Sequence, residues 1–443
     1  MKSIVNNYLF LKVSNFCICL LPLALLTGPA FPDFLVILSS IFFLVHLFYF
    51  KIDLITEKKL FFFFLLFYFF LLFSSSLSSH AWISLKFTLP YIRFILLAFL
   101  IAYLLENNKL IFLRFFFITC LVAVLILFFD SIFQFYSGKN ILGVASPVQG
   151  RIGSIFGDEL ILGSYALKIS PMFFISIFYL NINDILKKKI FFITYSMIFF
   201  IILISGDRAP LLLFFIYSLL LFFLLRPYRK LFFFIGFLLI TFFIMFLTIN
   251  KSSYKRIIVQ TINEIGLGKS DYTQKALGIN KDNNLKLYGQ NKKNFFSAIH
   301  ENYFITGIKI FNDHPIIGAG PKAYSQLSKS PQYALDDFSH VGHPHNFYIQ
   351  LLAETGIIGF TTVFLFLIYL IIKYRTIQNH YKQNCNRFDI LITGIPISGL
   401  IFHLWPLTTT GSFFTNYNCI LIYMCLGFYL GRGKILLYPA INK

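Results

Sequence analysis

Apolar and polar positions alternate in long blocks along the 443-residue chain, with apolar runs separated by short polar turns. Runs of about 17–25 apolar residues match, as helices, the roughly 30 Å hydrocarbon core of a bilayer. The pattern predicts an all-α polytopic membrane protein with about twelve transmembrane helices. The predicted helices lie near residues 14–31, 33–50, 60–77, 87–105, 110–136, 159–180, 190–205, 209–225, 231–249, 346–372, 389–407 and 417–431.

The composition agrees with a membrane protein and excludes an ordinary soluble domain. Hydrophobic residues make up 58% of the chain, charged residues only 13%, and the mean hydropathy is +0.75. A soluble domain carries about a quarter charged residues. The six cysteines show no metal-ligand spacing and are interpreted as small buried hydrophobes. The first apolar run lacks a convincing small-residue cleavage site, so it is predicted to be a retained helix.

The net charge of +20 would suggest a nucleic-acid partner in a soluble chain, but its distribution predicts membrane topology instead. Twenty Lys and Arg residues lie in the termini and the alternate turns that share a side with them, against four in the short turns on the other side. Positive charge accumulates on the cytoplasmic side, so both termini are predicted to be cytoplasmic and the helix count even. Ten or eleven helices would follow if a short run were re-entrant.

One polar segment interrupts the pattern between the ninth and tenth predicted helices. We therefore expect three regions: helices 1–9 in residues 1–249, a periplasmic loop domain in 250–345, and helices 10–12 with a cytoplasmic C-terminus in 346–443. A loop this long is usually functional or disordered. Its middle (266–293) is predicted to be mobile, and its second half, with helical patterning at 295–311, to form a small cap over the outer mouth of the bundle.

The end of the loop contains the best candidate for a catalytic base. His345 is predicted to lie in the first turn of the tenth helix, where a neutral imidazole with a pKa near 6.5 can accept a proton. On that helix Gly356 and Gly359 would lie on the same face as His345 and would allow a neighbouring helix to pack closely. Glu354 would point away. The alternative is that His343 and His345 only cap the helix beside Pro344.

Four further positions could supply positive charge to an anionic substrate. Arg208 lies in a tight turn between two apolar helices, and an Arg at hydrocarbon depth costs roughly 2.5–3.5 kcal/mol, so it is seldom there without a partner. It could bind a phosphate through its guanidinium fork, or simply pair with Asp207 or extend into the headgroups. Arg151 follows a glycine-rich turn on the same side, and His300 and Lys309 lie on the helical stretch of the loop.

Other polar positions are assigned less active roles. His403 is interpreted as a packed histidine, whereas the intramembrane Arg93 and Lys168 could line a groove, although the sequence indicates no partner for either. The segment 313–321, with Pro315 and Gly318, is predicted to be the end of a helix followed by a rigid turn. No nucleotide-binding glycine loop, Walker motif or metal-ligand cluster is present, so no metal or cofactor is predicted. The energy for any transfer would have to arrive in an activated donor.

These motifs resemble those of the O-antigen ligase and O-antigen polymerase superfamily. The resemblance lies in His345-Asn346 followed by Gly356 and Gly359, in the 313–321 turn and in Ser-Gly-Asp-Arg at 205–208, in the family's order. It implies a metal-independent, inverting glycosyltransferase at the periplasmic face of the bacterial inner membrane. The donor would be a glycan on undecaprenyl diphosphate, and the acceptor a sugar hydroxyl on lipid A–core or a growing glycan.

The same resemblance assigns roles to individual residues. It makes His345 the base that activates the acceptor, Arg208 a ligand of the donor diphosphate, and Asn346 a substrate contact. Many family members carry a second essential arginine in the loop, where this chain has His300 instead, and His300 is taken as a phosphate contact. The chemistry fits, because a lipid diphosphate leaves readily when cations stabilise its developing charge.

The sequence leaves several functions open. A ligase transfers a finished glycan, whereas a polymerase joins repeat units on the same carrier, and a protein O-glycosyltransferase would share the donor. A transporter of lipid or polysaccharide would predict charges at mid-membrane and two related halves of broken helices, and no internal repeat is found. Sugar identity, linkage and oligomeric state cannot be predicted from the chain.

Overall fold

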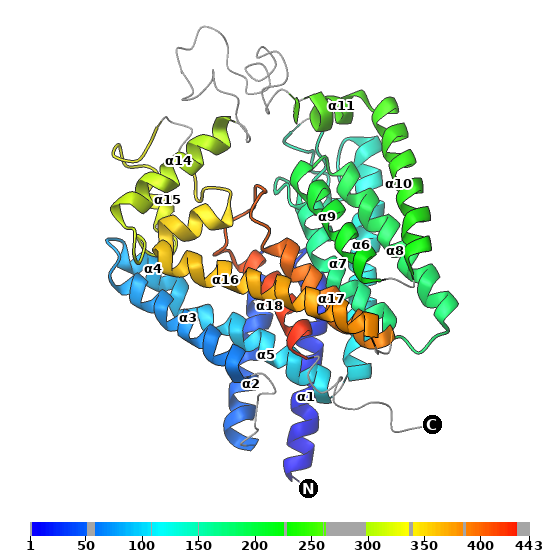
Figure 1. The fold of residues 1–443 in the computed structure, drawn as a ribbon, viewed down its shortest axis with the longest axis horizontal. Coiled ribbons are helices and arrows are strands. Elements are labelled where there is room, and N and C mark those ends of the chain that lie inside the picture. The colour runs from blue at the N-terminus through cyan, green and yellow to red at the C-terminus, as the bar shows by residue number, and fades with distance from the viewer. Residues whose placement is uncertain are drawn as a thin grey trace.

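The computed structural model describes the chain in nine ranges, namely residues 2–50, 58–107, 109–148, 150–225, 228–259, 261–262, 298–335, 340–383 and 387–431. Within these ranges the protein is helical and has no β-strand. Figure 1 shows the helices as one bundle, with the polar segments gathered at one end. The predicted mobile segment 266–293 and the C-terminal residues 432–443 lie outside the described residues.

A helix is present in each of the twelve predicted ranges. The twelve are α1 (Lys2–Ala24), α2 (Ala30–Phe50), α3 (Lys58–Ser76), α5 (Ile92–Asn107), α6 (Lys109–Ser137), α7 (Leu162–Phe178), α8 (Asp184–Ile204), α9 (Arg208–Leu224), α10 (Arg229–Ile249), α16 (Phe347–Gln383), α17 (Arg387–His403) and α18 (Asn416–Leu430). The first prediction, 14–31, has the wrong bounds at both ends. The helix ends early because Gly28 has a φ of +103° and is followed by Pro29, which together terminate it.

Shorter elements connect these helices or belong to the polar segment. They are α4 (Ala81–Thr88), the 3₁₀ turns η1 (Leu89–Tyr91) and η2 (Ser154–Phe156), α11 (Lys251–Tyr254), the π-helical turn η4 (Lys255–Val259), α14 (Ala298–Asp313) and α15 (Tyr324–Leu327). The helical prediction at 295–311 thus corresponds to α14.

Length and apolarity make this a multi-pass membrane protein. Among the described residues six helices are long and apolar enough to cross a bilayer, and four shorter apolar helices accompany them. The six segments are Ala30–Phe48, Lys59–Ser76, Ala81–Asn107, Leu110–Ser137, Arg229–Ile249 and Phe347–Ile377. A total of twelve crossings stays a prediction.

The core of the bundle consists of α5, α7 and α18, whose side chains are almost all buried. At the periphery α10 exposes large apolar side chains, such as Phe233 at 76% and Phe237 at 64%, which suit contact with lipid. The close approach of α18 to α5 depends on Gly427, where a Cβ would lie 2.8 Å from the Ala98 carbonyl oxygen, and on Gly431 one turn later. Small residues of this kind allow helices to associate closely in membranes.

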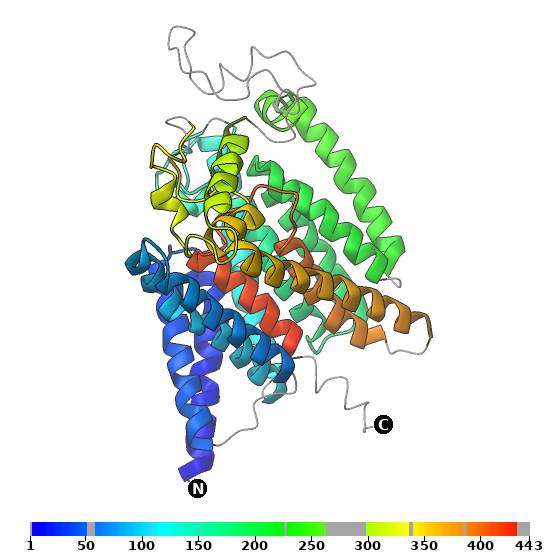
Figure 2. The same ribbon diagram turned by 60° about the vertical axis from the view of Figure 1, so that its left-hand side comes forward.

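The described parts of the polar segment lie together at the end of the bundle opposite the amino end of α1. Figures 1 and 2 show α14 and α15 against the beginning of α16, with α11 at the same end beyond α10. We call this the loop end of the bundle. A second small core forms there between the loop and α16, and it includes Ile310, Tyr324, Tyr333 and Ala353. The loop is therefore packed on the bundle where α16 begins.

Candidate functional site

His345 lies just before α16, not in its first turn as predicted. The helix begins at Phe347, and Asn346 caps it by accepting hydrogen bonds from the amides of Tyr348 (2.9 Å) and Ile349 (3.1 Å). His345 itself has a left-handed backbone, with a φ of +54°. Non-glycine residues adopt this conformation only at a cost of about 1–3 kcal/mol, and such strain concentrates at functional sites. The imidazole therefore projects from a strained turn above the helix.

The connection between α17 and α18 fixes this turn in place. The Asn346 side-chain amide donates to the carbonyl oxygens of Pro406 (2.9 Å) and Thr408 (3.2 Å), and the Thr410 amide donates to the His345 carbonyl (2.7 Å). Both functional groups of the Asn346 side chain are thus used in backbone contacts. This geometry gives Asn346 the role of positioning His345, and substrate contact by Asn346 stays a prediction.

Gly356 interrupts α16, so the predicted continuous stripe from His345 to the two glycines is wrong. Its backbone is non-helical, with a φ of 61° and a ψ of −164°. The kink frees carbonyl groups of α16, and the turn at 313–321 uses them: the amides of Ala319 and Gly320 donate to the carbonyls of Ala353 and Glu354, both at 2.9 Å. The Ile357 amide donates in return to the Pro315 carbonyl at 2.8 Å. The exchange satisfies backbone groups that would otherwise be unpaired.

Two glycines make this contact possible, because the backbones approach so closely that a side chain at either position would clash. A Cβ on Gly318 would lie 2.3 Å from the Thr355 amide nitrogen, and one on Gly356 would lie 2.4 Å from the Ile316 carbonyl oxygen. Both glycines also have positive φ. Gly359 is farther down α16, where a Cβ would approach Phe70 of α3 to 3.3 Å. The glycines of the motif therefore join the loop, α16 and α3.

Three histidines and a tyrosine gather at the turn before α16. The ring centre of His345 lies 4.2 Å from that of His343, 5.5 Å from that of His300, and 5.4 Å from that of Tyr303, on which it stacks. His300 and Tyr303 come from α14. The structure thus brings together His300 and His345, which the sequence separates by 45 positions.

Burial keeps these imidazoles neutral at neutral pH. It lowers the pKa of His345 below its ordinary 6.5, although a hydrogen bond with the Thr410 backbone opposes the shift. Burial and the charges of His345 and Arg208 lower the pKa of His300 to about 4. Burial, His345 and Lys322 lower that of His343 to about 3. A neutral imidazole is the form that accepts a proton.

Arg208 is the first residue of α9, at the amino end of the helix. One of its guanidinium nitrogens donates to the Thr261 hydroxyl (3.2 Å), and its charge acts on His300 across the site. The amino end of a helix favours anions because its amides lack partners and its dipole is positive there. Arg208 does not form the local pair with Asp207 considered from the sequence, because Asp207 is paired with Arg151.

Arg151 and a residue not singled out from the sequence, Arg256, surround the same turn. Arg151 pairs with Asp207 and donates to the Leu160 carbonyl (3.1 Å), so its guanidinium is largely engaged within the protein. Arg256 of η4 donates to the Gly206 carbonyl at 3.1 Å, and its charge also acts on Asp207. No local motif marks Arg256, because only the return of the chain after α10 brings it to this turn.

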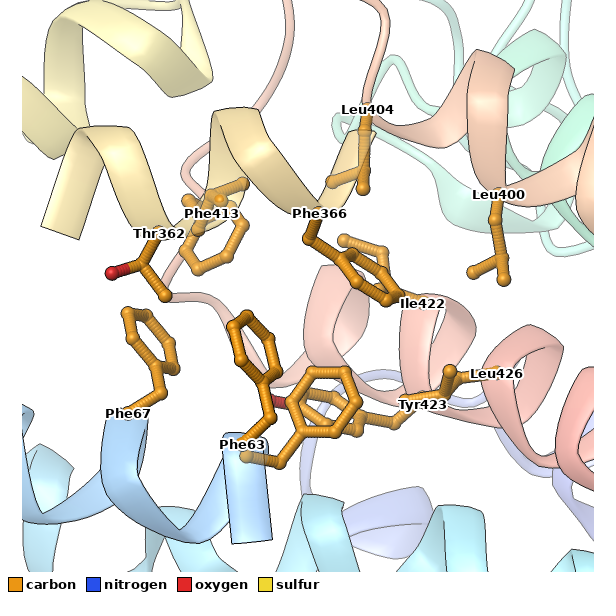
Figure 3. Close-up of a pocket in the computed structure, with 12 residues that line it drawn as sticks. Phe63, Phe67, Thr362, Phe366, Leu400, Leu404, Phe413, Ile422, Tyr423 and Leu426 are labelled. Carbon is orange, nitrogen blue, oxygen red and sulfur yellow. The ribbon is translucent and has the colours of Figure 1, made fainter. Parts of the chain in front are cut away.

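The described part of the bundle contains an apolar cavity and a partly polar one. The first, of about 40 Å³, lies between α3, α16, α17 and α18. Figure 3 shows its apolar lining, in which aromatic and aliphatic side chains are mixed. The hydroxyl of Thr362 in its wall donates to the Ile358 carbonyl (2.8 Å), so it is not available to a sugar. The second cavity, of about 470 Å³, is lined by apolar and polar residues together and reaches His343 at the loop end.

The described residues contain no cluster of three or more His, Cys, Asp or Glu arranged to hold a metal ion. Fold and site together define a multi-pass, all-helical membrane protein that places a neutral histidine and arginines at one end of its bundle. A sequence model of the family described as O-antigen ligase matches residues 193–395, which include the Ser205 turn, the loop and most of α16. Over these residues the chain is similar to the O-antigen ligase family, in agreement with the resemblance seen in its motifs. No curated protein matches the chain.

Proposed function

We propose that the protein transfers a glycan from undecaprenyl diphosphate to a sugar hydroxyl at the periplasmic face of the bacterial inner membrane. The similarity of residues 193–395 to the O-antigen ligase family supports this class of reaction. The observation that carries the proposal is the position of His345, a neutral, half-buried imidazole on a strained turn beside His300, on which the charge of Arg208 at the amino end of α9 acts.

In this mechanism His345 takes the proton of the acceptor hydroxyl as its oxygen bonds to the anomeric carbon of the donor sugar. The bond from that carbon to the diphosphate oxygen breaks, and the electron pair leaves with the diphosphate. Attack from the face opposite the leaving group inverts the anomeric centre. Arg208 and the amino end of α9 stabilise the departing charge. His300, neutral with a pKa of about 4, contributes a hydrogen bond rather than a positive charge.

The ligase reaction, with lipid A–core as acceptor, is our first choice, and the polymerase reaction is the alternative. Both require the same base and the same donor site, so the two differ only in what occupies the acceptor position. We propose that the loop end faces the periplasm and that both termini are cytoplasmic. The distribution of Lys and Arg between the turns supports this orientation.

The proposal is tested by complementing a deletion strain with the wild-type gene, with His345→Gln, and with His340→Gln as a matched control. His340 is exposed and lies outside the cluster. We expect His345→Gln to reduce surface glycan by at least about 10²-fold at unchanged membrane levels, because it removes the base. His340→Gln should restore it fully. Wild-type-like glycan with His345→Gln would contradict the role of His345.

The same strains separate the two reactions. In the deletion strain a ligase leaves lipid A–core without any O-chain, while polymer accumulates on the lipid carrier. A polymerase leaves lipid A–core that carries a single repeat unit. The lipopolysaccharide band pattern on a gel distinguishes these outcomes directly.

A further inference from the structure

The polar cavity at the loop end has a size and lining suited to a sugar. Its volume of about 470 Å³ falls within the roughly 300–1,000 Å³ typical of small-molecule sites. It lies between the turn after α1, the end of α4, the amino ends of α7 and α18, and the segment around Lys322. Its lining combines aromatic rings with amide, hydroxyl and charged groups, among them Phe87, Ser164, Lys168, Lys322, His343 and Asn418.

Two lysines give the cavity a positive character. Lys168 is buried in α7, where its ammonium donates to the Asn418 side-chain oxygen (2.6 Å) and lies 5.7 Å from the Tyr417 ring centre. Lys322 lies 5.6 Å from the ring centre of Phe87. Within the described ranges neither lysine has a carboxylate at ion-pair distance. A lysine in a membrane helix is costly, so Lys168, which faces a cavity without a carboxylate at ion-pair distance, suits an anionic ligand. Lys322 lies in the loop segment, and its charge also acts on the buried Glu354.

The charge balance of the cavity favours one negative group on the ligand. Glu159 also belongs to the lining, but its side chain is exposed, at the rim. Arg93, the other intramembrane cation, is not part of the lining and is neutralised by Asp33 at 2.9 Å. Among the lining residues Lys168 and Lys322 therefore meet one exposed carboxylate, while the buried Glu354, outside the lining, interacts with the charge of Lys322.

His343 connects this cavity to the base. Its ring lines the cavity and lies 4.2 Å from that of His345, and its buried Nε2 has no hydrogen-bond partner among the described residues. Arg208 acts electrostatically on His300, and Lys322 acts on His343, while both histidine rings contact His345. The base is therefore flanked by two different sets of cations.

The backbone at Lys322 supports a ligand-directed role. Its φ of 68° is left-handed, and of the three non-glycine residues with positive φ in the described part of the chain, two are Lys322 and His345. Strain of this kind persists only where the surroundings enforce it, and it concentrates at ligand sites. The two strained residues thus lie on the two sides of His343.

We propose that this cavity binds the acceptor, and that the acceptor sugar carries a phosphate or carboxylate near the hydroxyl that reacts. The inference rests on the proposed glycosyl transfer. Lys168 and Lys322 bind the anionic group, the aromatic rings contact the sugar, and the unpartnered Nε2 of His343 accepts or donates a hydrogen bond. The hydroxyl then projects past His343 toward His345.

A phosphate could also come from the donor diphosphate, and the arrangement favours the acceptor. Arg208, Arg256 and the amino end of α9 already provide an anion site on the His300 side of the base. In-line displacement requires the hydroxyl and the leaving group on opposite sides of the anomeric carbon. A second cationic set on the His343 side therefore fits the incoming substrate.

Binding to the full-length protein in nanodiscs tests the proposal with two probes. The acceptor probe is rough lipopolysaccharide extracted from a strain that lacks the protein, intact or with its phosphates removed by aqueous hydrogen fluoride. The donor probe is undecaprenyl diphosphate. The variants are Lys168→Gln and Lys322→Gln, and Lys329→Gln, an exposed lysine of the same segment, is the control. Elution from size exclusion and the thermal midpoint verify that each variant is folded.

We expect each cavity variant to weaken intact acceptor binding by roughly tenfold, as for loss of one charge-assisted contact. Binding of undecaprenyl diphosphate and behaviour of Lys329→Gln should be unchanged. Phosphate removal should weaken binding to the wild type and reduce the difference between wild type and variants. An equal loss of undecaprenyl diphosphate binding in the variants would assign the cavity to the donor and overturn the proposal. So would acceptor binding that is unchanged in both variants. Absence of acceptor binding to the wild-type protein would overturn it as well.

The two proposals can fail separately. If the wild-type protein binds the acceptor through the lysines but neither binds undecaprenyl diphosphate nor transfers glycan, the transferase function fails while the anion site stands. If transfer is intact in Lys168→Gln and Lys322→Gln with an unchanged KM for the acceptor, the cavity assignment fails alone.

Discussion

At the scale of single residues, the burial of His345 suits it to the role of base that we propose. The imidazole loses solvent against His300, His343 and Tyr303, which disfavours its charged form and keeps it able to accept a proton at neutral pH. The strained turn holds its ring in place through Asn346 and the Thr410 amide. Reactivity and orientation therefore have separate structural causes.

The lowered pKa of His345 predicts the pH dependence of transfer. The neutral form is the active one, so kcat/KM should be constant from about pH 7 to 8 and fall on the acid side, with a midpoint below 6.5. Initial rates of glycan transfer by the purified protein between pH 5 and 8 would show this. A midpoint above 7 would indicate that another group is the base.

Arg208 allows a test of geometry against charge. A lysine keeps the charge but loses the planar fork that can bind two phosphate oxygens, so Arg208→Lys should reduce kcat/KM for the donor by about 10²-fold. Arg114→Lys, an exposed arginine on α6, is the control and should have no effect. Full activity with Arg208→Lys would mean that only charge matters at this position.

At the scale of elements, the kink in α16 and the turn at 313–321 form one unit. Each supplies the backbone partners that the other lacks, so neither conformation is stable without its counterpart. Ser74 of α3 and Ser78, just after it, contact the same turn by donating to the carbonyls of Ile317 (2.8 Å) and Ala319 (2.5 Å). The loop is therefore anchored to two helices directly below His345.

Gly356→Ala should break this unit. The new methyl group would lie 2.4 Å from the Ile316 carbonyl oxygen at a backbone with positive φ, so we expect destabilisation by about 2 kcal/mol or more and loss of transfer. Gly236→Ala in α10 meets no atom within 4 Å and should be neutral or slightly stabilising. The thermal midpoints of the two variants in detergent make the comparison. An unchanged midpoint for Gly356→Ala would show that the kink can relax.

At the scale of the whole molecule, the polar candidate site lies at one end of an apolar helical bundle. The helices α5, α7 and α18 form a buried core around which α10 and other helices expose apolar side chains. The site lies where the loop, α9 and the α17–α18 connection meet. In the reaction that we propose, this arrangement would place the substrate-binding groups at the surface of the membrane, where a lipid-linked donor presents its diphosphate.

The orientation of the bundle can be measured with single cysteines. Lys329→Cys should react with a membrane-impermeant maleimide in intact spheroplasts, whereas Lys188→Cys should react only after permeabilisation, because the positive-inside rule places them on opposite sides. Both positions are exposed, and five native cysteines are buried. Cys385 is replaced by Ser in the background. The reverse labelling pattern would invert the proposed topology.

The sequence by itself determined the class of protein, the places of the helices and the main candidates for chemistry. Apolar runs predict membrane helices directly because each helix satisfies its own backbone and shows its side chains to lipid or to neighbours. The resemblance to the O-antigen ligase family could also be recognised from the sequence, because the spacing of His345, Gly356 and Gly359 and the 205–208 turn match the motifs of that family. Boundaries were less accurate wherever a Gly-Pro pair ended a helix early.

Only the tertiary structure decided which residues meet. Periodicity places Gly356 on a straight helix, but the 313–321 turn stabilises a kink there by exchanging backbone hydrogen bonds with it. Arg256, Lys322 and Lys168 approach the site from segments far apart in the chain, and a linear pattern contains no information on such contacts. Their roles depend on burial and on neighbouring charges, which exist only after the helices have packed.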